Sequence, residues 1–570
     1  MNRALSILRP TRFSFLLWLS FVAAVALSAL APDRYGTLRV SIIDQSSKLP
    51  TPARVELLDA KNEAFVAEDA LAVGTDAGDR KTPWQGTLEQ DKARLSKTVN
   101  NSNTGTKQFY SAGTFTASVP AGTYRLKAWK GPEYTAAARE LTIEPNGSLE
   151  LTIAMSRWIN MPAQGWYGAD DHLHISRPLK ERDPLISKWM QAEDIHVANM
   201  LGFSHSRQLP GVYNTPQHAF GAPGGYQEGN HLLLSSQENP RTHLLGHAIV
   251  LGARSYLNFP DNYLLYGPVF EEARRQGALS GYAHYGFRMG AQFGLAIDLP
   301  GNNLNFIEIL QFNDGIYDVW YDVLNAGFRL APTAGTDYPA GDATRVSLPG
   351  RERFYTQVEG PLTPDNWLEG VRRGRTFATN GPMLEFRVNG KSMGAEIALS
   401  KPASVEIEGR VQFDPARDEV DRLEVVENGQ VVRSVPRDGG AAEIRCRFQH
   451  TVQDSGWLAL RAVGKKVGER RLFLPRYDFY TLPSLAHSAP IYVTRKKAPG
   501  RASQRGGRSS LQTWIARLDD LKARLSDDRL EGLVRGGPDG VNLEVLQKNR
   551  QSLLEAIERA RRQYLRREYQ

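Results

Sequence analysis

The first folded part of the chain is expected between Tyr35 and Trp158, where apolar and polar residues alternate in short runs. Period-two runs bounded by turn residues are typical of β-strands. Phe115–Val119 and Thr123–Ala128 are separated by Pro-Ala-Gly, which indicates a hairpin. Further runs lie at Leu38–Ile43, Ala53–Leu58, Leu141–Ile143 and Leu149–Ile153. We therefore predict a small β-sandwich over 35–158, with the polar stretch Thr75–Thr106 as a surface insertion and no catalytic constellation.

Between residues 160 and 383, apolar runs of strand length alternate with segments of helical spacing. The helical segments are Pro184–Asp194, Gly267–Gln276 and Val319–Ala326. The apolar runs are Ile195–Leu201, His231–Ser235, His247–Leu251, Ala278–Ala283, Asn305–Leu310 and Phe328–Thr333. Strands that alternate with helices favour a mainly parallel sheet, open or closed into a barrel. We predict a central α/β barrel-like core over 160–383.

Short strand patterns return over 384–495 and predict a second β-rich domain of the sandwich type. Residues 496–510 are rich in Gly, Arg and Lys and predict a flexible linker. Two apolar stripes follow over 511–570, one from Leu511 to Leu525 and one from Leu543 to Tyr564. They predict an antiparallel helical hairpin packed on the body, with a coil that binds a partner as the alternative.

Residues 1–31 have the pattern of an export signal. Arg3, Arg9 and Arg12 precede Phe13–Ala31, an apolar run without charge. Pro32 would hinder cleavage after Ala31, and cleavage after Ser28 is the alternative. The run is also nearly long enough to span a bilayer, so an uncleaved anchor is a second interpretation. Both predict an exported body, periplasmic or extracellular.

Length and composition indicate a soluble protein of several domains. The chain of 570 residues is too long for one core, and its 41% hydrophobic and 23% charged content is ordinary for a folded protein. Much of the net charge of +8 comes from the two ends and the linker. That distribution indicates solvated basic surfaces, with attraction to an anionic membrane or envelope polymer as the alternative. No aromatic and basic patch indicates nucleic acid, and the single Cys446 excludes an intramolecular disulfide.

The histidines are concentrated in one part of the chain. Nine of the 11 lie in the 113 residues from His172 to His284, where an even distribution would place about two. His172 and His174 are two positions apart, so on a strand both imidazoles leave from one face. The alternative is a set of ordinary core and surface histidines. We predict a metal site.

Three further candidate ligands follow predicted strands. His284 and Asp337 come directly after strands, and Glu238 comes shortly after another. In an α/β barrel, functional residues gather at the carboxyl edge of the strands, on the loops. Glu308 lies in mid-strand and either points into this site or pairs with a buried cation.

Several ordered motifs resemble those of the PHP-type metallohydrolases, and more narrowly their exported, carbaryl-hydrolase-like branch. They are Gly165-Trp-Tyr-Gly-Ala-Asp-Asp-His-Leu-His174, Ser-Gln-Glu238-Asn-Pro-Arg, Gly-His247-Ala-Ile-Val-Leu-Gly, Gly-Tyr-Ala-His284, Gly-Thr-Asp337 and Gly374-Arg-Thr-Phe-Ala-Thr-Asn-Gly-Pro382. The β-rich tail also resembles that branch, so the resemblance covers about 165–570. Ala-Gly-Thr-Tyr-Arg-Leu126 resembles the carboxypeptidase-regulatory-like sandwich, an accessory module.

The resemblance implies one or two divalent transition metal ions (Zn, Mn or Fe). Imidazoles with a few carboxylates suit these ions better than calcium or magnesium. The implied ligands are His172, His174, Glu238, His247, His284 and Asp337, with Glu238 as the bridge between two ions. His243 competes with His247 for one position. Asp170 is expected to orient an imidazole, with an acid on the surface at the strand end as the alternative. His205 is a reserve general acid whose alternative is a solvent-facing loop histidine.

Arg375 and Asn380 lie on a loop rich in Gly and Pro and are candidate contacts to a small-molecule substrate, unless the loop only forms a turn. The resemblance implies hydrolysis of an ester, carbamate or amide by metal-activated water, with phosphoester hydrolysis as the alternative. A non-catalytic envelope or carbohydrate-binding protein is a third possibility. Family members commonly carry Asp-His where this chain has Asn199-Met200, and a His where it has Tyr338-Pro339. Both changes predict a smaller metal set.

Overall fold

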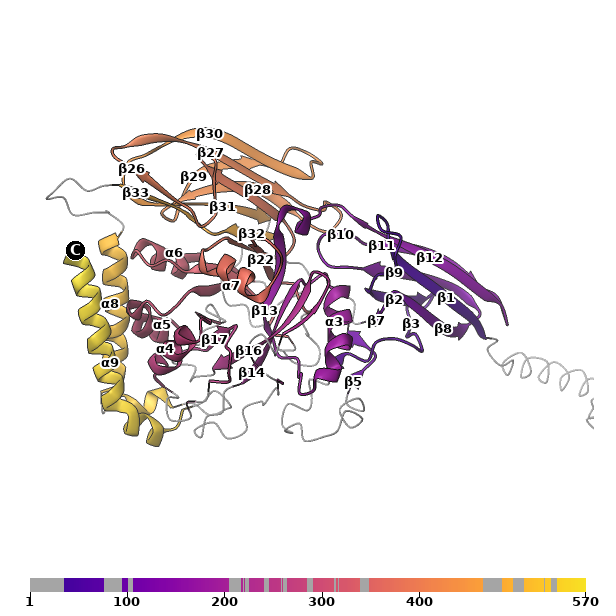
Figure 1. The fold of residues 1–570 in the computed structure, drawn as a ribbon, viewed down its shortest axis with the longest axis horizontal. Helices are drawn as coiled ribbons and strands as arrows, with labels where there is room; N and C mark the ends of the chain where they lie inside the picture. The colour runs from indigo at the N-terminus through magenta and orange to yellow at the C-terminus, as the bar shows by residue number, and fades with distance from the viewer. Residues whose placement is uncertain are drawn as a thin grey trace, which may run out of the picture.

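The computed structural model gives a protein of several sheets and C-terminal helices (Figure 1). It describes residues 35–75, 95–100, 106–203, 217–218, 220, 225–239, 245–257, 259, 264–283, 291–311, 314–315, 317–338, 348–464, 484–495, 507–526, 528–534 and 541–569. The expected export signal and most of the expected linker lie outside these residues. Within them, no helix is long and apolar enough to cross a membrane.

The N-terminal region is a β-sandwich. One sheet has the order β10-β12-β1-β8 and the other β11-β9-β2-β7-β6, with β3 beside β2 and a separate β4–β5 pair. Every second residue of β1 is buried, because Leu38, Val40 and Ile42 face the core between the sheets. The strands are β1 (Tyr35–Asp44), β2 (Ala53–Asp59), β3 (Ala64–Phe65), β4 (Gly74–Thr75), β5 (Leu95–Ser96), β6 (Val99–Asn100), β7 (Lys107–Ser111), β8 (Thr114–Pro120), β9 (Gly122–Trp129), β10 (Tyr134–Thr135), β11 (Ala137–Ile143) and β12 (Ser148–Arg157).

The predicted surface insertion of the sandwich differs from the structure in its described part. Val99 is buried in a cluster with Tyr110 and Trp189, so it packs toward the central region. Its apolar side chain, isolated in a polar stretch, gave no periodic signal for this burial.

The central region contains a ring of strands. β13 (Trp166–Leu173), β14 (Val197–Phe203) and β16 (His231–Asn239) pair in parallel, and β18 (Leu279–Tyr282), β19 (Phe306–Gln311) and β21 (Ala331–Ala334) do likewise. β17 (Ala248–Leu251) joins the two sets. The ring closes through a parallel bridge between Leu173 and Tyr338, where the N–H of His174 donates to the Tyr338 carbonyl at 2.7 Å. Closure brings the ends of β13 and β21 together.

Helices cover the ring, and three lie where the spacing predicted them. These three are α3 (Asp183–Ala192), α4 (Gly267–Arg275) and α6 (Tyr317–Asn325). The pattern did not predict α5 (Ala291–Asp298) or α7 (Pro364–Arg372). Short elements complete the region: η2 (Pro162–Gln164), η3 (Lys180–Arg182), β15 (Tyr226–Glu228), η5 (Leu299–Gly301) and β20 (Asp314–Gly315).

The sheet is mixed where a mainly parallel one was expected. β17 runs antiparallel to both β16 and β18. Residues 240–247 are all that connects β16 to β17, whereas a parallel crossover needs about a dozen residues or more. The short connection therefore forces the reversal.

The C-terminal β region shares its sheet with the core rather than forming a detached domain. β22 (Arg353–Gln357) pairs with β13 and β23, and β23 (Thr376–Thr379) pairs with β32. Its own apolar core includes Phe386, Leu423 and Leu460. The remaining strands are β24 (Met383–Val388), β25 (Lys391–Ser392), β26 (Glu396–Leu399), β27 (Ala403–Gln412), β28 (Val420–Glu427), β29 (Gln430–Pro436), β30 (Glu443–Val452), β31 (Gly456–Gly464), β32 (Leu485–Ser488) and β33 (Ile491–Arg495).

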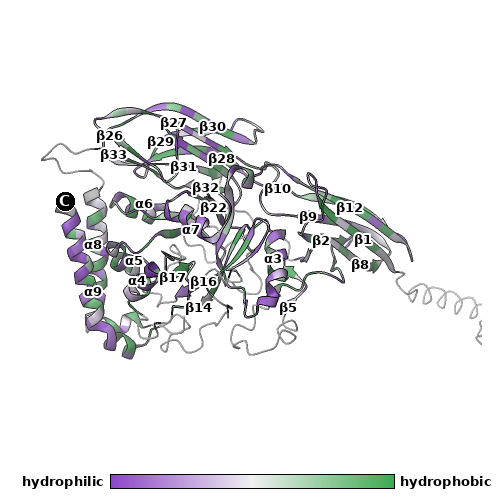
Figure 2. Cartoon of the chain, in the orientation of Figure 1, coloured by the Kyte–Doolittle hydropathy of each residue, from purple (hydrophilic) through white to green (hydrophobic). Residues whose placement is uncertain are grey.

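The expected helical hairpin packs on the body. α8 (Gly507–Arg524), η6 (Leu530–Leu533) and α9 (Leu543–Tyr569) form it, and the pairs Lys522–Glu558 and Arg561–Asp519 show that the helices are antiparallel. Both apolar stripes belong to the main hydrophobic core, and hydrophilic residues follow the outer side of α9 (Figure 2). This confirms the packed hairpin.

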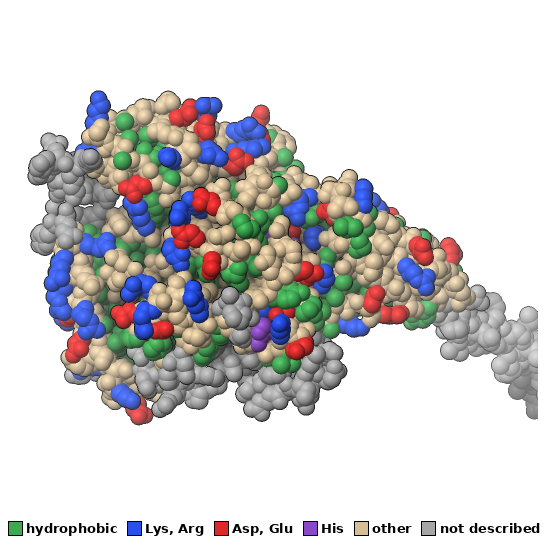
Figure 3. All heavy atoms as spheres, viewed as in Figure 1, with side chains coloured by type: hydrophobic (Ala, Val, Ile, Leu, Met, Phe, Trp, Pro, Cys, Tyr) green, Lys and Arg blue, Asp and Glu red, His purple; other side chains and the backbone are tan. Residues whose placement is uncertain are grey.

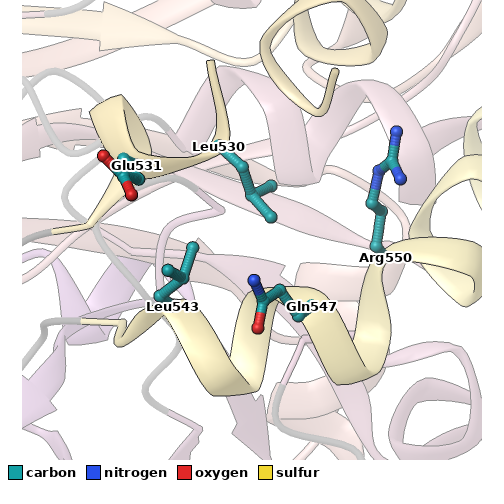
Figure 4. Close-up of a pocket in the computed structure, with 5 residues that line it drawn as sticks. All are labelled: Leu530, Glu531, Leu543, Gln547 and Arg550. Carbon is teal, nitrogen blue, oxygen red and sulfur yellow. The ribbon is translucent and has the colours of Figure 1, made fainter. Parts of the chain in front are cut away.

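A small cavity of about 260 Å³ lies within this hairpin (Figure 4). Leu530 of η6 faces Leu543 and Gln547 of α9, with Glu531 and Arg550 at the sides. The outer edge of the hairpin also carries several Lys and Arg side chains (Figure 3). Four of the hairpin's described cations pair with acids of the hairpin, as Lys522–Glu558, Arg524–Asp520, Arg559–Glu555 and Arg561–Asp519.

One buried histidine predicts a pH dependence of folding. Burial lowers the pKa of His487 to about 3, the Ser488 carbonyl opposes this, and Arg461 adds to it. Below a pH of about 6.5, His487 takes up a proton in the unfolded chain but not in the folded chain. Its contribution to the free energy of unfolding is therefore fully present above pH 6.5 and is lost as the pH falls toward 3. We expect His487→Gln to reduce the slope of unfolding free energy against pH in that window by about 1.4 kcal/mol per pH unit. Urea unfolding between pH 4 and 7 measures both slopes, and identical slopes would contradict the expectation.

Candidate metal centre

Two imidazoles meet at the carboxyl end of β13. His172 is the penultimate residue of the strand and His174 follows it, and both leave on one side of the chain as the spacing predicted. Their Nε2 atoms are 3.1 Å apart. The side chain of His172 is fully buried and that of His174 is 9% exposed, so the pair lies at the inner limit of solvent access.

Glu238 and Asp337 bring carboxylate oxygens to the same point. Oε2 of Glu238, from β16, lies 3.0 Å from Nε2 of His174 and 3.5 Å from Nε2 of His172. Oδ1 of Asp337, which follows β21, lies 3.1 Å and 3.3 Å from the same nitrogens. Gly335 permits this approach, because a Cβ there would stand 2.5 Å from Cβ of His172.

The spacing of these atoms fits a metal ion. Nε2 of His172, Nε2 of His174 and Oε2 of Glu238 form a triangle with sides of 3.1, 3.0 and 3.5 Å. Atoms on one face of a zinc tetrahedron with bonds of about 2.0–2.1 Å are about 3.3 Å apart. Two imidazoles and one carboxylate also form the ligand set of catalytic sites that keep one coordination position open. The residues present therefore fit a divalent transition metal.

His247 lies against the other oxygen of Glu238. Its Nδ1 is 2.7 Å from Oε1, whereas Oε2 faces the His172 and His174 pair. Of the six predicted ligands, the structure thus brings five together. The sixth, His284, lies outside the described residues, as do His243 and His205, so the choice between His243 and His247 stays a prediction.

The charges around the site favour a cation. Burial opposes ionisation of Glu238, but the imidazoles of His172 and His247 outweigh it and hold the pKa of this carboxyl well below its ordinary value. Burial also opposes charge on His172, yet Asp337, Glu308 and Glu238 raise the pKa of its imidazole well above the ordinary value. A metal ion would replace the proton that this negative field attracts.

Asp170 does not orient an imidazole, which corrects the sequence prediction. Its Oδ1 accepts the backbone N–H groups of His172 at 3.0 Å and Thr336 at 3.1 Å. Its Oδ2 accepts the Thr336 hydroxyl at 2.6 Å and the N–H of Gly350 at 2.8 Å. The carboxylate therefore fixes backbone at the ends of β13 and β21. Strand alternation did not reveal this, because three of its four donors are backbone N–H groups.

Glu308 orients His172 instead. It points inward from β19, and its Oε1 lies 3.0 Å from Nδ1 of His172. A proton on Nδ1 donated to this carboxylate leaves the lone pair of Nε2 directed at the site. Asp171, fully buried beside it, has its pKa raised well above the ordinary value by burial and by the charge of Glu308.

We expect Glu308→Gln to weaken metal binding, because the amide cannot stabilise the proton on Nδ1 as a carboxylate does. Loss of such a partner typically costs about 10–100-fold in affinity. Competition with a chromogenic chelator on the metal-free protein measures this change. An affinity equal to that of the wild type would contradict the role given to Glu308.

The structure gives the contacts of Asn199, Met200 and Tyr338, which differ from the motifs that the sequence resembles. The buried Asn199 donates from Nδ2 to the carbonyl of Asp170 at 3.2 Å and accepts the Ser236 hydroxyl at 3.2 Å. Met200 and Tyr338 pack in an apolar cluster with Trp189. Pro339 lies outside the described residues. Asn199 thus serves the backbone of the centre rather than extending its ligand set.

A second group of ligand-type residues, Asp194, His196 and His231, does not fit a metal. Nδ1 of His196 accepts the N–H of Gly168 at 3.3 Å, so its proton sits on Nε2 and leaves no lone pair there. Asp194 is paired with Arg157 at 3.0 Å. Burial, His231 and nearby arginines hold the pKa of His196 well below its ordinary value, against the charge of Asp194. This environment repels a cation.

The two candidate substrate contacts lie at opposite ends of β23. Arg375 pairs with Glu359 at 2.6 Å, and Asn380 accepts the N–H of Leu485 at 2.7 Å. The five residue steps from Arg375 to Asn380 span about 17 Å in an extended chain. A shared role in substrate recognition stays a prediction, and neither contact supports it.

Comparison with known proteins adds little beyond the geometry. No family model and no curated protein matches the chain. Among solved structures, it is similar to a two-domain protein from Bacteroides vulgatus containing a predicted PHP-like metal-dependent phosphoesterase. The identity is 11%, with 57% of this chain and 94% of that chain covered and a TM-score of 0.30. It is also similar to an engineered protein at 10% identity, with 55% and 52% covered and a TM-score of 0.14.

Proposed function

We propose that this protein is an exported metal-dependent hydrolase of the PHP type that acts on an ester, carbamate or amide bond. The observation that carries the proposal is the triangle of His172, His174 and Glu238 donor atoms, buried at the end of the strand ring with the spacing of a zinc site. His172, His174 and Glu238 would hold the ion, with Asp337 and His247 beside them.

A divalent transition metal supplies water activation near neutral pH and polarises a substrate oxygen when bound. The side chains divide the remaining tasks. Glu308 fixes the ring of His172, and Asp170 fixes the backbone that carries His172. Glu238 offers negative charge to positive groups on both sides, because Oε2 faces His172 and His174 and Oε1 faces His247. The side chain of His172 is fully buried, whereas those of His174 and Asp337 are 9% and 13% exposed, so a substrate would approach from the side of these two residues.

Metal content and a substrate panel test the proposal. We expect the purified protein to bind zinc, manganese or iron, and to hydrolyse chromogenic esters or carbamates in a reaction that a chelator stops and added metal restores. Protein without bound metal and without chelator-sensitive turnover would overturn the proposal.

Phosphoester hydrolysis is the second candidate, and the two faces of Glu238 favour it. Oε2 faces His172 and His174, whereas Oε1 faces His247, so one carboxylate is placed to serve two ions. Paired ions stabilise both the attacking and the leaving oxygen of a phosphoester. Two tightly bound ions with dominant phosphatase turnover in the same panel would select this candidate.

Export rests on the first 31 residues, with their basic start and uncharged apolar run. The body would then act outside the cytoplasm, with or without an N-terminal anchor. A reporter fused after residue 60 that works only in the cytoplasm would contradict export.

A further inference from the structure

Arg353 is a buried cation on β22 whose partners are backbone carbonyls. The residue is 3% exposed. It donates from Nε to the carbonyl of Gly350 at 2.5 Å, and from its two terminal nitrogens to the carbonyls of Asp194 at 3.0 Å and Glu193 at 2.9 Å. Burial of a guanidinium is costly unless its donors are satisfied, so this residue has a specific task.

The Gly350 turn is shaped around this guanidinium. Its φ of 69° lies in the left-handed region, and a Cβ there would stand 2.6 Å from Nη2 of Arg353 and 2.7 Å from Ile195. With its carbonyl held by Arg353, Gly350 presents its N–H to Oδ2 of Asp170 at 2.8 Å. Gly350 therefore links the two side chains, because its carbonyl accepts from Arg353 and its N–H donates to Asp170.

Asp170 passes this constraint to the ligands. The same carboxylate holds the backbone N–H of His172 and of Thr336, the residue before Asp337. Displacement of the Gly350 N–H would leave a buried carboxylate oxygen with one donor fewer, and Asp170 would shift toward its remaining donors. That shift would move the backbone that carries two of the candidate ligands.

The other end of the Arg353 contact is fixed by the N-terminal sandwich. Glu193 and Asp194 form the turn after α3, and Asp194 has a strained φ of 52°. Arg54 of β2 holds the Glu193 carboxylate at 2.7 Å, and Arg157 of β12 holds that of Asp194 at 3.0 Å. The carbonyls that receive Arg353 are thus braced by the sandwich.

We propose that Arg353 is a positioning residue for the metal centre, which acts through Gly350 and Asp170 on the segments that carry His172 and Asp337. The inference rests on the proposed function. It implies that the sandwich contributes to metal affinity as well as to folding, because it holds the carbonyls on which Arg353 is anchored.

The test is the Zn²⁺ affinity of Arg353→Lys in the full chain. Lysine keeps the charge but lacks the planar fork that reaches three carbonyls. We expect Zn²⁺ binding about 10-fold weaker, at the low end of what loss of a ligand's supporting group costs. Thr336→Val, which removes another donor to Asp170 outside the sandwich contact, should weaken Zn²⁺ in the same direction. The matched control is Arg417→Lys, because Arg417 also contacts the sandwich, at the carbonyl of Pro132 at 2.7 Å, without touching Gly350 or Asp170.

Arg417→Lys should leave Zn²⁺ affinity unchanged. Wild-type affinity in Arg353→Lys, or an equal loss in Arg417→Lys, would overturn the inference and leave the proposed function standing. If the wild-type chain binds none of Zn²⁺, Mn²⁺ and Fe²⁺, the proposed function fails, and amide exchange then decides the inference alone. Arg353→Lys should speed exchange in peptides containing His172 and Thr336, and unchanged exchange there would overturn it. If Arg353→Lys does not fold, the Gly350→Ala variant, which crowds Nη2 of Arg353, takes its place in both measurements with the same expected and contrary results.

Discussion

Replacement of His172 and His174 together by alanine is expected to abolish metal binding. The two Nε2 atoms are 3.1 Å apart, and each lies within 3.5 Å of both Oε2 of Glu238 and Oδ1 of Asp337. The double variant would keep the two carboxylates but remove both imidazoles that face Oε2 of Glu238, leaving His247 on the other oxygen. Carboxylates with so few imidazoles hold transition metals poorly at neutral pH. Metal analysis should therefore find about one ion per chain in the purified wild type and none in the purified double variant. The variant should also lose chelator-sensitive turnover.

The matched control for this variant is His231→Gln. His231 belongs to the other group of ligand-type residues, where Nδ1 donates to the carbonyl of Ile195 at 2.7 Å. Metal content should stay at the wild-type level, because the positive surroundings of that group exclude a cation. Full metal stoichiometry in the double variant, or its loss in the control, would show that the ion is bound elsewhere.

Local periodicity was sufficient to predict the parts of the site that depend on a single strand. Two histidines with a spacing of two share a face of a strand. Glu238 lies in the last part of β16 and Asp337 follows β21, and the carboxyl ends of these strands meet at one edge. The apolar stripes of α8 and α9 likewise predicted their packing. In each case, a short-range pattern determines a side chain's direction.

The interactions that the sequence did not reveal are long-range pairs. Glu308 meets His172 across 136 positions, and Gly350 meets Asp170 across 180. Nothing near either residue indicates its partner, since the register of the closed ring decides the contact. The role of Asp170 was misjudged for the same reason: its partners include the turn before β22, which packs on Arg353. The pairing of β23 with β32 was missed because the Gly and Pro residues around Thr376–Thr379 indicated a loop, whereas these residues form a strand.

These long-range contacts make the metal centre a property of the whole chain. The ring supplies the ligands, whereas the sandwich, through Arg54 and Arg157, holds the turn on which Arg353 is anchored. The hairpin completes the core beneath α5, where the hydroxyl of Tyr564 donates to the carbonyl of Ala296 at 3.0 Å. Loss of a flanking part should therefore disturb the centre even where no ligand is removed.

Glu238→Gln is expected to have the second-largest effect on metal binding. The carboxylate is 1% exposed and lies within 3.5 Å of nitrogens from His172, His174 and His247. The amide keeps the shape but removes the negative charge, and its NH₂ group cannot be a ligand. We expect metal affinity to fall by at least about 100-fold, because even loss of a group that merely supports a ligand costs about 10–100-fold.

Stabilisation by metal gives a readout of Glu238→Gln that is independent of turnover. An ion that binds only the folded chain stabilises it in proportion to the logarithm of its affinity, so a 100-fold loss removes about 2.7 kcal/mol of that stabilisation. Glu228→Gln is the matched control, since Glu228 lies on β15, beside the opposite end of β16, and pairs with Lys188 at 2.6 Å. An exposed pair of this kind contributes about 0–1 kcal/mol to folding and nothing to metal binding. Urea unfolding of both variants with and without Zn²⁺ measures the difference, and equal stabilisation by Zn²⁺ in both would remove Glu238 from the ligand set.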